Sequence, residues 1–215
     1  MGNVLSKDYP PVNPENPLLK VSNLTRLMIG PVSFDVGAGE CVAITGPSGT
    51  GKSVLLRAIV DLDPNDGQVQ AGGVIRADVP APDWRKTVAM LPAESGWWLD
   101  HVAPHFQAPD RIRGQLSLVG LPETAMEWEV ARLSTGEKHR LALLRCLEGG
   151  PKVLLLDEPT AALDHDTTLQ IEALLKQQLG KGTAILIVTH DAAQAKRLAH
   201  RILRLEDGQL QQVAA

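Results

Sequence analysis

A run of eight residues, GPSGTGKS at positions 46–53, has the composition and spacing of a loop that wraps a phosphate group. It follows an apolar run and opens a helical pattern, which is the context that the motif G-x-x-x-x-G-K-[ST] requires. Its glycines let backbone N–H groups converge on a β-phosphate, while Lys52 reaches the β- and γ-phosphates and the Ser53 hydroxyl reaches Mg²⁺. The sequence therefore predicts a nucleoside triphosphate site. The residues expected to form it are Gly46, Pro47, Ser48, Gly49, Thr50, Gly51, Lys52, Ser53 and Val54.

Two acidic residues close a second apolar run, VLLLDE at positions 153–158. Asp157, at the tip of the expected strand, suits the coordination shell of Mg²⁺. Glu158 is placed to accept a proton, as a general base, from a water that attacks the γ-phosphate. Strands often end in solvated acids, so this prediction depends on the pairing with the phosphate loop.

A second anion-binding pattern, LSTGE at positions 133–137, comes directly before another helical pattern. Ser134 and Gly136 fall at the N-terminus of that helix, where free N–H groups and the helix dipole attract negative charge. One phosphate loop is enough for the nucleotide that the chain holds itself. The second pattern therefore suggests a role toward a nucleotide held by another copy.

Together these motifs resemble the nucleotide-binding subunit of an ABC (ATP-binding cassette) transporter, over residues 18–210. The matching parts are the Walker A loop 46–53, the signature 133–137, the Walker B strand through Glu158, the D-loop 162–164 and the switch histidine His190. The resemblance implies a RecA-like α/β core of the P-loop NTPase type, with a β-rich N-terminal part and a short α-helical subdomain. The subdomain is expected over about residues 84–146, within a domain that spans residues 18–215 behind a flexible lead-in of residues 1–17.

The resemblance also implies a mechanism and partners. Mg²⁺-dependent ATP hydrolysis would take place in a head-to-tail homodimer that drives a separate transmembrane permease from the cytoplasmic face of the inner membrane. Glu158 and His190 would be the catalytic pair, with His190 sensing the γ-phosphate. The residues assigned to the partner's nucleotide are Ser134, Gly136, Glu137 and Asp164.

Two parts of the sequence depart from the family's usual pattern. The signature has Thr135 and Glu137 where glycine and glutamine are commonest. The region after the first strand, LTRLM at positions 24–28, lacks the aromatic residue that usually stacks on adenine. We therefore expect loose recognition of the base.

A third departure lies in the stretch MLPAESGWWLD, positions 90–100. The family's Q-loop glutamine, which joins the Mg²⁺ site to the helical subdomain, falls at Ala93, and Glu94 follows as a candidate metal ligand in its place. The resemblance also implies that Trp97 and Trp98 lie on the surface that receives the permease in this family. Either the two indoles are hot spots of that contact, or they pack inside the helical subdomain.

Apolar periodicity places the elements that position these residues. Strands are expected at residues 18–21, 32–36, 40–45, 87–91, 153–157, 184–189 and 202–206, and helices at 52–60, 136–147, 167–179 and 192–199. Hairpin turns are expected at residues 37–39 and 207–208. The runs 40–45, 153–157 and 184–189 are apolar throughout, as in central strands of a parallel sheet covered on both faces. The pattern predicts an α/β fold.

Composition excludes several alternatives. The formal net charge is −4 and basic residues form no block, which disfavours nucleic acid as a partner. No apolar run approaches the ~20 residues of a membrane span. The start MGNVLS fits an N-myristoylation pattern, a short motif that occurs often by chance.

Two other functions compete with transport. A soluble ABC-type ATPase that remodels a protein complex or assembles a metal cluster would share every motif above. A P-loop kinase would leave the signature 133–137 and His190 without a role.

Overall fold

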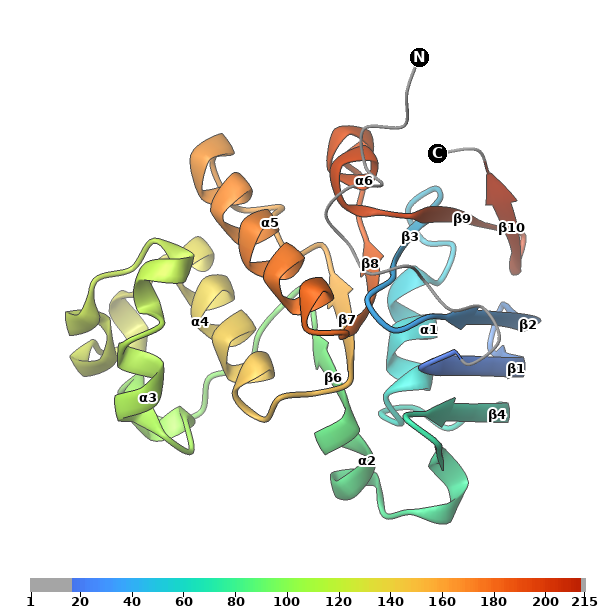
Figure 1. Ribbon diagram of the computed structural model, residues 1–215, viewed down its shortest axis with the longest axis horizontal. Helices are drawn as coiled ribbons and strands as arrows, with labels where there is room; N and C mark the ends of the chain where they lie inside the picture. The colour runs from blue at the N-terminus through green and yellow to red at the C-terminus, as the bar shows by residue number, and fades with distance from the viewer. Residues whose placement is uncertain (1–16, 214–215) are drawn as a thin grey trace.

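The computed structural model describes residues 17–213. The expected lead-in 1–17, with the lipidation pattern, therefore lies outside the described residues apart from Pro17. At the centre is a six-stranded sheet of order β10-β9-β3-β8-β7-β6, parallel except between β9 and β10 (Figure 1). Its strands are β3 (Cys41–Thr45), β6 (Val88–Leu91), β7 (Val153–Asp157), β8 (Ala184–Val188), β9 (Arg201–Glu206) and β10 (Gln209–Val213).

A second, antiparallel sheet of order β2-β1-β4-β5 is built from the N-terminal part. Its strands are β1 (Leu19–Arg26), β2 (Ile29–Val36), β4 (Asp66–Ala71) and β5 (Val74–Ile75). The predicted strands covered only parts of β1 and β2, and β4 and β5 were missed. In β4, DGQVQA, only Val69 and Ala71 are buried, so too few apolar residues alternate to reveal a strand.

Helices cover both faces of the six-stranded sheet. The α-helices are α1 (Lys52–Ile59), α2 (Ala81–Thr87), α3 (Pro109–Arg113), α4 (Thr135–Glu148), α5 (His165–Gly180) and α6 (Ala192–Leu198). Figure 1 shows α4 and α5 on one face and α1 on the other, with the second sheet beyond α1. Five 3₁₀ turns lie at Arg76–Asp78, Ala103–His105, Leu116–Val119, Glu123–Glu127 and Val130–Arg132.

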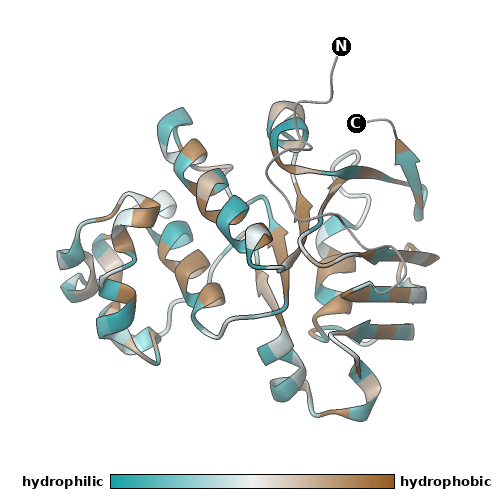
Figure 2. Cartoon of the chain, in the orientation of Figure 1, coloured by the Kyte–Doolittle hydropathy of each residue, from teal (hydrophilic) through white to brown (hydrophobic). Residues whose placement is uncertain are grey.

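Alternate side chains of the central strands pack into two separate hydrophobic cores. Leu154 and Leu156 of β7 face the cluster formed with α4, α5 and the insertion before α4. Val153 and Leu155 face the cluster formed with α1 and the second sheet. Each fully buried leucine contributes roughly 1.5–3 kcal/mol. Figure 2 shows these strands in brown, as the prediction of central strands apolar on both faces requires. The predicted α/β P-loop NTPase fold and the central placement of β3, β7 and β8 are confirmed.

One expected turn is wrong. Residues 37–39 do not close a hairpin, because β2 and β3 belong to different sheets. The chain crosses between the sheets there instead. The Gly37 N–H donates to Glu40 Oε2 at 2.7 Å, and the Gly39 N–H donates to the carbonyl of Gly182 at 3.1 Å. Glycine-rich turns of either kind look alike in sequence.

The range 84–146, expected to form the helical subdomain, contains elements of two kinds. Trp84 packs in the core beside α1 and donates its Nε1–H to the carbonyl of Ile59 at 3.0 Å, and β6 pairs with β7. Beyond β6 the chain forms only α3 and short 3₁₀ turns until α4. Pro104 and Pro109 lie in the first turns of two of these pieces, where proline is tolerated.

Candidate nucleotide site

The loop after β3 has the glycine-dependent shape of a phosphate cradle. Gly46 has a φ of +141°, and a side chain there would collide with the carbonyl of Leu205. Gly51 has a φ of +99° and lies against the side chain of Ile29, which leaves no room for a larger residue. Glycine is therefore required at both positions.

The helix that follows this loop begins without a side-chain cap. Gly51 is the N-cap residue of α1, and no side chain accepts a hydrogen bond from the first turn. N–H groups left in this way at a helix N-terminus bind anions readily. The nine residues predicted to hold the triphosphate thus lie along the end of β3, the loop and the first turn of α1.

Lys52 supplies the positive charge of the cradle. Its side chain is almost wholly buried, and its ammonium donates to the carbonyls of Gly46 and Pro47, each at 2.8 Å. Burial lowers the pKa of Lys52, while the charges of Glu158 and Asp157 act in the opposite direction. The lysine is thus held at the loop by backbone oxygens and faces both predicted acids.

The two acids of the second motif occupy the end of β7. Asp157 is the last residue of the strand and is 4% exposed. Glu158 follows with a φ of +51°, and its N–H donates to the carbonyl of Val188 at 2.9 Å. Left-handed backbone at a residue other than glycine costs on the order of 1 kcal/mol or more and gathers at functional sites.

His190 meets Glu158 at this edge of the sheet. Its Nε2 lies 2.8 Å from Glu158 Oε1, and both side chains are partly open to solvent. The contact follows from topology, because β7 and β8 are parallel neighbours and each residue comes just after its strand. The structure thus brings together the predicted general base and the predicted switch histidine.

The signature forms a closed cap on α4. Ser134 is the N-cap residue, and its Oγ accepts from the Glu137 N–H at 3.2 Å. In return Glu137 Oε2 accepts from both the N–H and the hydroxyl of Ser134, each at 2.8 Å. These hydrogen bonds from Ser134 lower the pKa of Glu137, which stays a carboxylate. An anion of the same chain therefore already occupies this helix N-terminus.

The remaining signature and D-loop residues lie next to each other. A side chain at Gly136 would press on the carbonyl of Ala162, so the signature and the D-loop touch within one chain. Asp164 is the N-cap residue of α5 and accepts from the N–H and hydroxyl of Thr167, each at 2.9 Å. These hydrogen bonds lower the pKa of Asp164.

The turn between β1 and β2 lies beside the phosphate loop and carries exposed apolar side chains. Leu27 is 71% exposed and Met28 is 55% exposed. The Met28 sulfur lies close to Gly51. Aliphatic and thioether groups thus stand at the place where the sequence lacks an aromatic ring.

The stretch that follows Glu94 holds two neighbouring tryptophans that differ in burial. Ala93 and Glu94 are exposed. Trp97 is partly buried against the core beneath the insertion, and its Nε1 has no partner among the described residues, whereas Trp98 is 69% exposed. The two indoles therefore occupy different environments. The part of the chain that the structure describes holds no group of three or more His, Cys, Asp or Glu side chains suited to a metal, so a role of Glu94 toward Mg²⁺ stays a prediction.

The tryptophans are held by residues that sequence reasoning missed. The guanidinium of Arg145 lies 4.6 Å from the ring centroid of Trp97 and 5.1 Å from that of Trp98. The rings of both tryptophans stack edge-on against His105, whose Nε2 accepts from the N–H groups of Trp98 and Leu99 at 3.1 Å. The Arg145 contact leaves little signal in the sequence, because Arg145 lies 48 positions after Trp97.

The geometry is that of a P-loop nucleoside triphosphatase. The sequence matches the family described as "ABC transporter" over residues 29–161. It is 38% identical over 206 residues to the aliphatic sulfonates import ATP-binding protein SsuB 3 of Pseudomonas syringae pv. tomato, across 89% of this chain and 74% of the relative. It is 36% identical over 202 residues to the Fe(3+) ions import ATP-binding protein FbpC of Streptomyces avermitilis, across 87% and 58% of the two chains.

A solved structure shows the same fold. The dimeric post-hydrolysis state of the ATP-binding cassette MJ0796, bound to ADP and Pi, is similar with a TM-score of 0.74 and 26% identity, across 91% of this chain and 97% of that one. The chain belongs to the ABC transporter family and is an ATP-binding subunit with ATPase activity.

Replacing Glu158 by glutamine should keep ATP binding but remove the base. We expect kcat to fall by about 10²–10⁴-fold, the usual contribution of general acid–base catalysis. Steady-state hydrolysis and nucleotide titration measure the two effects. Glu206→Gln, which alters an exposed carboxylate paired with Arg204, is the matched control and should leave kcat unchanged. Turnover at the native rate in Glu158→Gln would refute the assignment.

Proposed function

We propose that this subunit forms a head-to-tail homodimer around two ATP molecules and drives a separate transmembrane permease. The observation that carries the proposal is the uncapped N-terminus of α1 with the Glu158–His190 pair beside it, together with a second helix, α4, that begins within the signature. The dimeric state of the cassette MJ0796 supports the arrangement. In the proposed dimer, Ser134 and Gly136 of one copy face the nucleotide of the other copy. Asp164 lies at the contact between the two copies.

The residues present suit the hydrolysis of ATP. Glu158 takes a proton from the attacking water as the water oxygen bonds to the γ-phosphorus and the bond to the β-phosphate oxygen breaks, which gives ADP and phosphate. His190 holds Glu158 by the contact at 2.8 Å. Lys52 neutralises the phosphates. Ser53 and Asp157 would hold Mg²⁺, which supplies charge neutralisation when bound.

The permease is proposed as the membrane partner because the relatives are named as import ATP-binding proteins. No helix in residues 17–213 is both long enough and apolar enough to cross a bilayer. The subunit would therefore sit at the cytoplasmic face of the membrane, held by its partner. Aliphatic sulfonates and Fe(3+) ions are chemically unrelated cargoes, which indicates that cargo choice resides in the other subunits.

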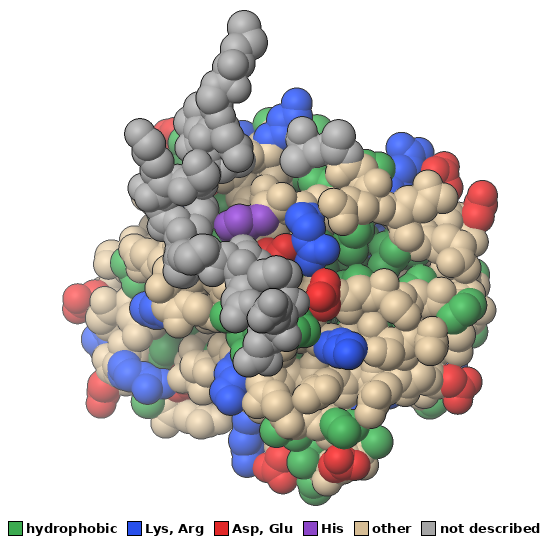
Figure 3. Space-filling model, turned by 45° about the vertical axis from the view of Figure 1, so that its right-hand side comes forward, with side chains coloured by type: hydrophobic (Ala, Val, Ile, Leu, Met, Phe, Trp, Pro, Cys, Tyr) green, Lys and Arg blue, Asp and Glu red, His purple; other side chains and the backbone are tan. Residues whose placement is uncertain are grey.

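Nucleic acid is not proposed as a partner. On the face in Figure 3, Lys and Arg side chains are mixed with Asp and Glu side chains over the described residues. Nucleic-acid surfaces instead gather positive charge on one face. The soluble remodelling ATPase is the less favoured alternative, since the relatives are transport subunits.

Co-expression with a neighbouring multi-span membrane protein tests the proposal. The pair should co-purify in mild detergent and, in lipid vesicles, hydrolyse ATP in step with cargo movement. An active subunit that binds a soluble complex but no membrane protein would favour the alternative.

The permease contact is proposed at a surface that we call the indole patch, formed by Trp98 and Leu99 with the adjoining hollow of about 570 Å³. The hollow is lined by Trp97, Trp98, Leu99, Asp100, His101, Glu129, Val130 and Ala131. Both Trp98 and Leu99 are exposed. Exposed neighbouring apolar groups with a polar rim are typical of protein contacts.

The two tryptophans should respond differently to replacement. Trp98→Ala should weaken permease association by at least ~2 kcal/mol, the usual size of a hot spot, and leave the Tm of the isolated subunit unchanged. Trp97→Ala should lower the free energy of unfolding by about 1–3 kcal/mol, because its ring packs on the core. Binding in detergent and thermal unfolding separate the effects. Equal permease affinity in wild type and Trp98→Ala would show that the indole patch is not part of the interface.

Glu137 should oppose formation of the ATP-bound dimer. Its carboxylate occupies the N–H and hydroxyl of Ser134 and repels a phosphate brought to α4. In a Glu158→Gln background we therefore expect Glu137→Gln, which keeps a capping side chain, to tighten the ATP-dependent dimer about five- to tenfold, or about 1–1.4 kcal/mol. Analytical ultracentrifugation measures it, with Ser134→Ala as the control that weakens the dimer. A weaker dimer in Glu137→Gln would show that the carboxylate helps to bind nucleotide.

Base selectivity should be modest. Leu27 and Met28 offer apolar contact but no ring, and stacking on an aromatic contributes about 1–3 kcal/mol per base. GTP should thus compete with ATP within about tenfold, a difference of roughly 1.4 kcal/mol. Competition with a fluorescent ATP analogue tests this, and Met28→Tyr should raise the affinity for both nucleotides. A much larger preference for ATP in the wild type would mean that another ring stacks, such as Tyr9, which lies outside the described residues.

A further inference from the structure

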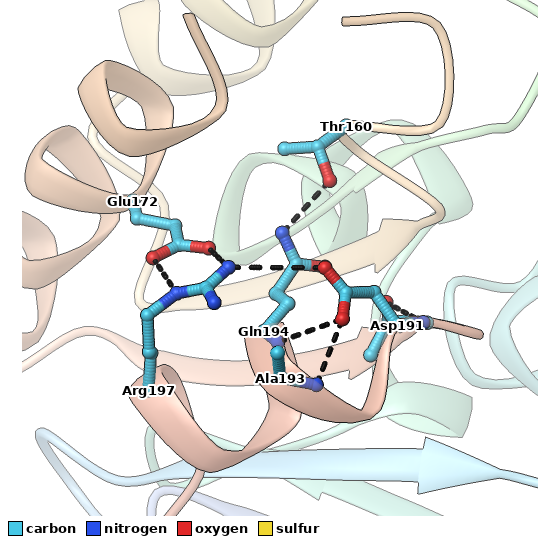
Figure 4. A network of polar contacts seen from close by, with 7 residues as sticks. Thr160, Glu172, Asp191, Ala193, Gln194 and Arg197 are labelled. Atoms are coloured by element: carbon cyan, nitrogen blue, oxygen red, sulfur yellow. Dashed lines mark hydrogen bonds and ion pairs between the residues drawn. The ribbon is translucent and has the colours of Figure 1, made fainter. Parts of the chain in front are cut away.

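A wholly buried amide links two loops of the catalytic edge. Gln194, on α6, is 0% exposed, and its Nε2 donates to Thr160 Oγ1 at 2.8 Å (Figure 4). The other amide atom, Oε1, has no partner within residues 17–213. A half-satisfied buried amide costs about 1–3 kcal/mol, so an apolar side chain would serve stability better here.

The amide joins the segments that carry the catalytic pair. Thr160 lies two residues after Glu158, and the Ala161 N–H donates to the carbonyl of Glu158 at 3.3 Å. Gln194 lies one helical turn after His190. Asp191 fixes that turn, because its Oδ1 accepts from the N–H groups of Ala193 and Gln194 at 2.7 and 3.1 Å.

A second contact fixes α6 on α5. The guanidinium of Arg197 donates to both carboxylate oxygens of Glu172, at 2.8 and 2.7 Å, and Glu172 is 2% exposed. Figure 4 shows Gln194 reaching Thr160 and Arg197 reaching Glu172, so α6 is held at two places along its length. The Arg197 contact places the helix against α5, and the Gln194 contact sets its position relative to the turn that follows β7.

We propose that Gln194 is a positioning residue for hydrolysis. Its hydrogen bond to Thr160 makes the switch segment and the turn after Glu158 move together, and so maintains the contact between His190 and Glu158. The inference rests on the proposed function, and it extends that function. In the proposed dimer the same turn leads into the D-loop at the contact with the other copy. A displacement of the turn by the partner therefore reaches His190 through Gln194.

Isosteric substitutions test the positioning role. Gln194→Met and Thr160→Val each remove the hydrogen bond and nearly conserve volume. We expect each to lower kcat by about ten- to a hundredfold, the scale of a small misplacement of reacting groups, with KM for ATP unchanged. Tm should be unchanged or higher in Gln194→Met, because the unpaired buried oxygen is gone. The double variant should lose no more than the worse single variant.

Two controls separate positioning from general structural damage. Thr160→Ser keeps the hydroxyl and should keep near-native kcat. Trp84→Phe removes another buried side-chain hydrogen bond, far from the switch segment, and should reduce stability without lowering kcat. If Gln194→Met does not fold, the Thr160→Val and Thr160→Ser pair decides the question.

The outcomes also separate this inference from the proposed function. Native kcat in Gln194→Met and Thr160→Val, or equal losses in Thr160→Val and Thr160→Ser, would overturn the positioning role alone. A Glu158→Gln variant that hydrolyses ATP at the wild-type rate would instead overturn the proposed mechanism.

Discussion

The site depends on the burial of three parallel strands. β3, β7 and β8 are covered on both faces, so the positions along these strands must be filled by apolar side chains. Polar groups are possible only where these strands end. Because parallel strands end at one edge, the phosphate loop, Asp157 and His190 are brought together there although they are far apart in the sequence. The chemistry of the protein is thus confined to one edge of the sheet by the hydrophobic requirements of its centre.

The two helix N-termini at the site differ in a way that bears on assembly. α1 begins at a glycine with no side-chain cap, next to a buried lysine, and so attracts phosphate without help. α4 begins at Ser134, whose donors are already used by the Glu137 carboxylate. A phosphate must compete with that carboxylate. We therefore expect α1 to bind a nucleotide in a single chain, and in the proposed dimer α4 would contact only a nucleotide that the other copy already holds.

The sequence was sufficient for the parts governed by local rules. Apolar runs identified the central strands, and motif spacing identified the loop at 46–53 and the acids at 157 and 158, which the fold places at one edge. It was insufficient where tertiary contacts decide. β4 is mostly polar because only one side of it is covered. Trp97 and Trp98 differ in exposure because Trp97 packs against the core beneath the insertion, whereas Trp98 stays 69% exposed. Gln194 gives no motif signal, since a lone glutamine on a helix is usually solvated.

The polar groups around α6 are best understood as determinants of position. The ion pair joins a buried carboxylate, Glu172, to an arginine that is one-third exposed, Arg197, and removing Arg197 would leave the buried charge of Glu172 without this partner. The interaction therefore penalises every placement of α6 but one. The Gln194–Thr160 hydrogen bond has the same property on a smaller scale. Apolar packing alone would tolerate small sliding of this short helix. The contact of 2.8 Å between His190, just before this helix, and Glu158, proposed to be catalytic, requires a fixed position, and directional polar contacts supply that restraint.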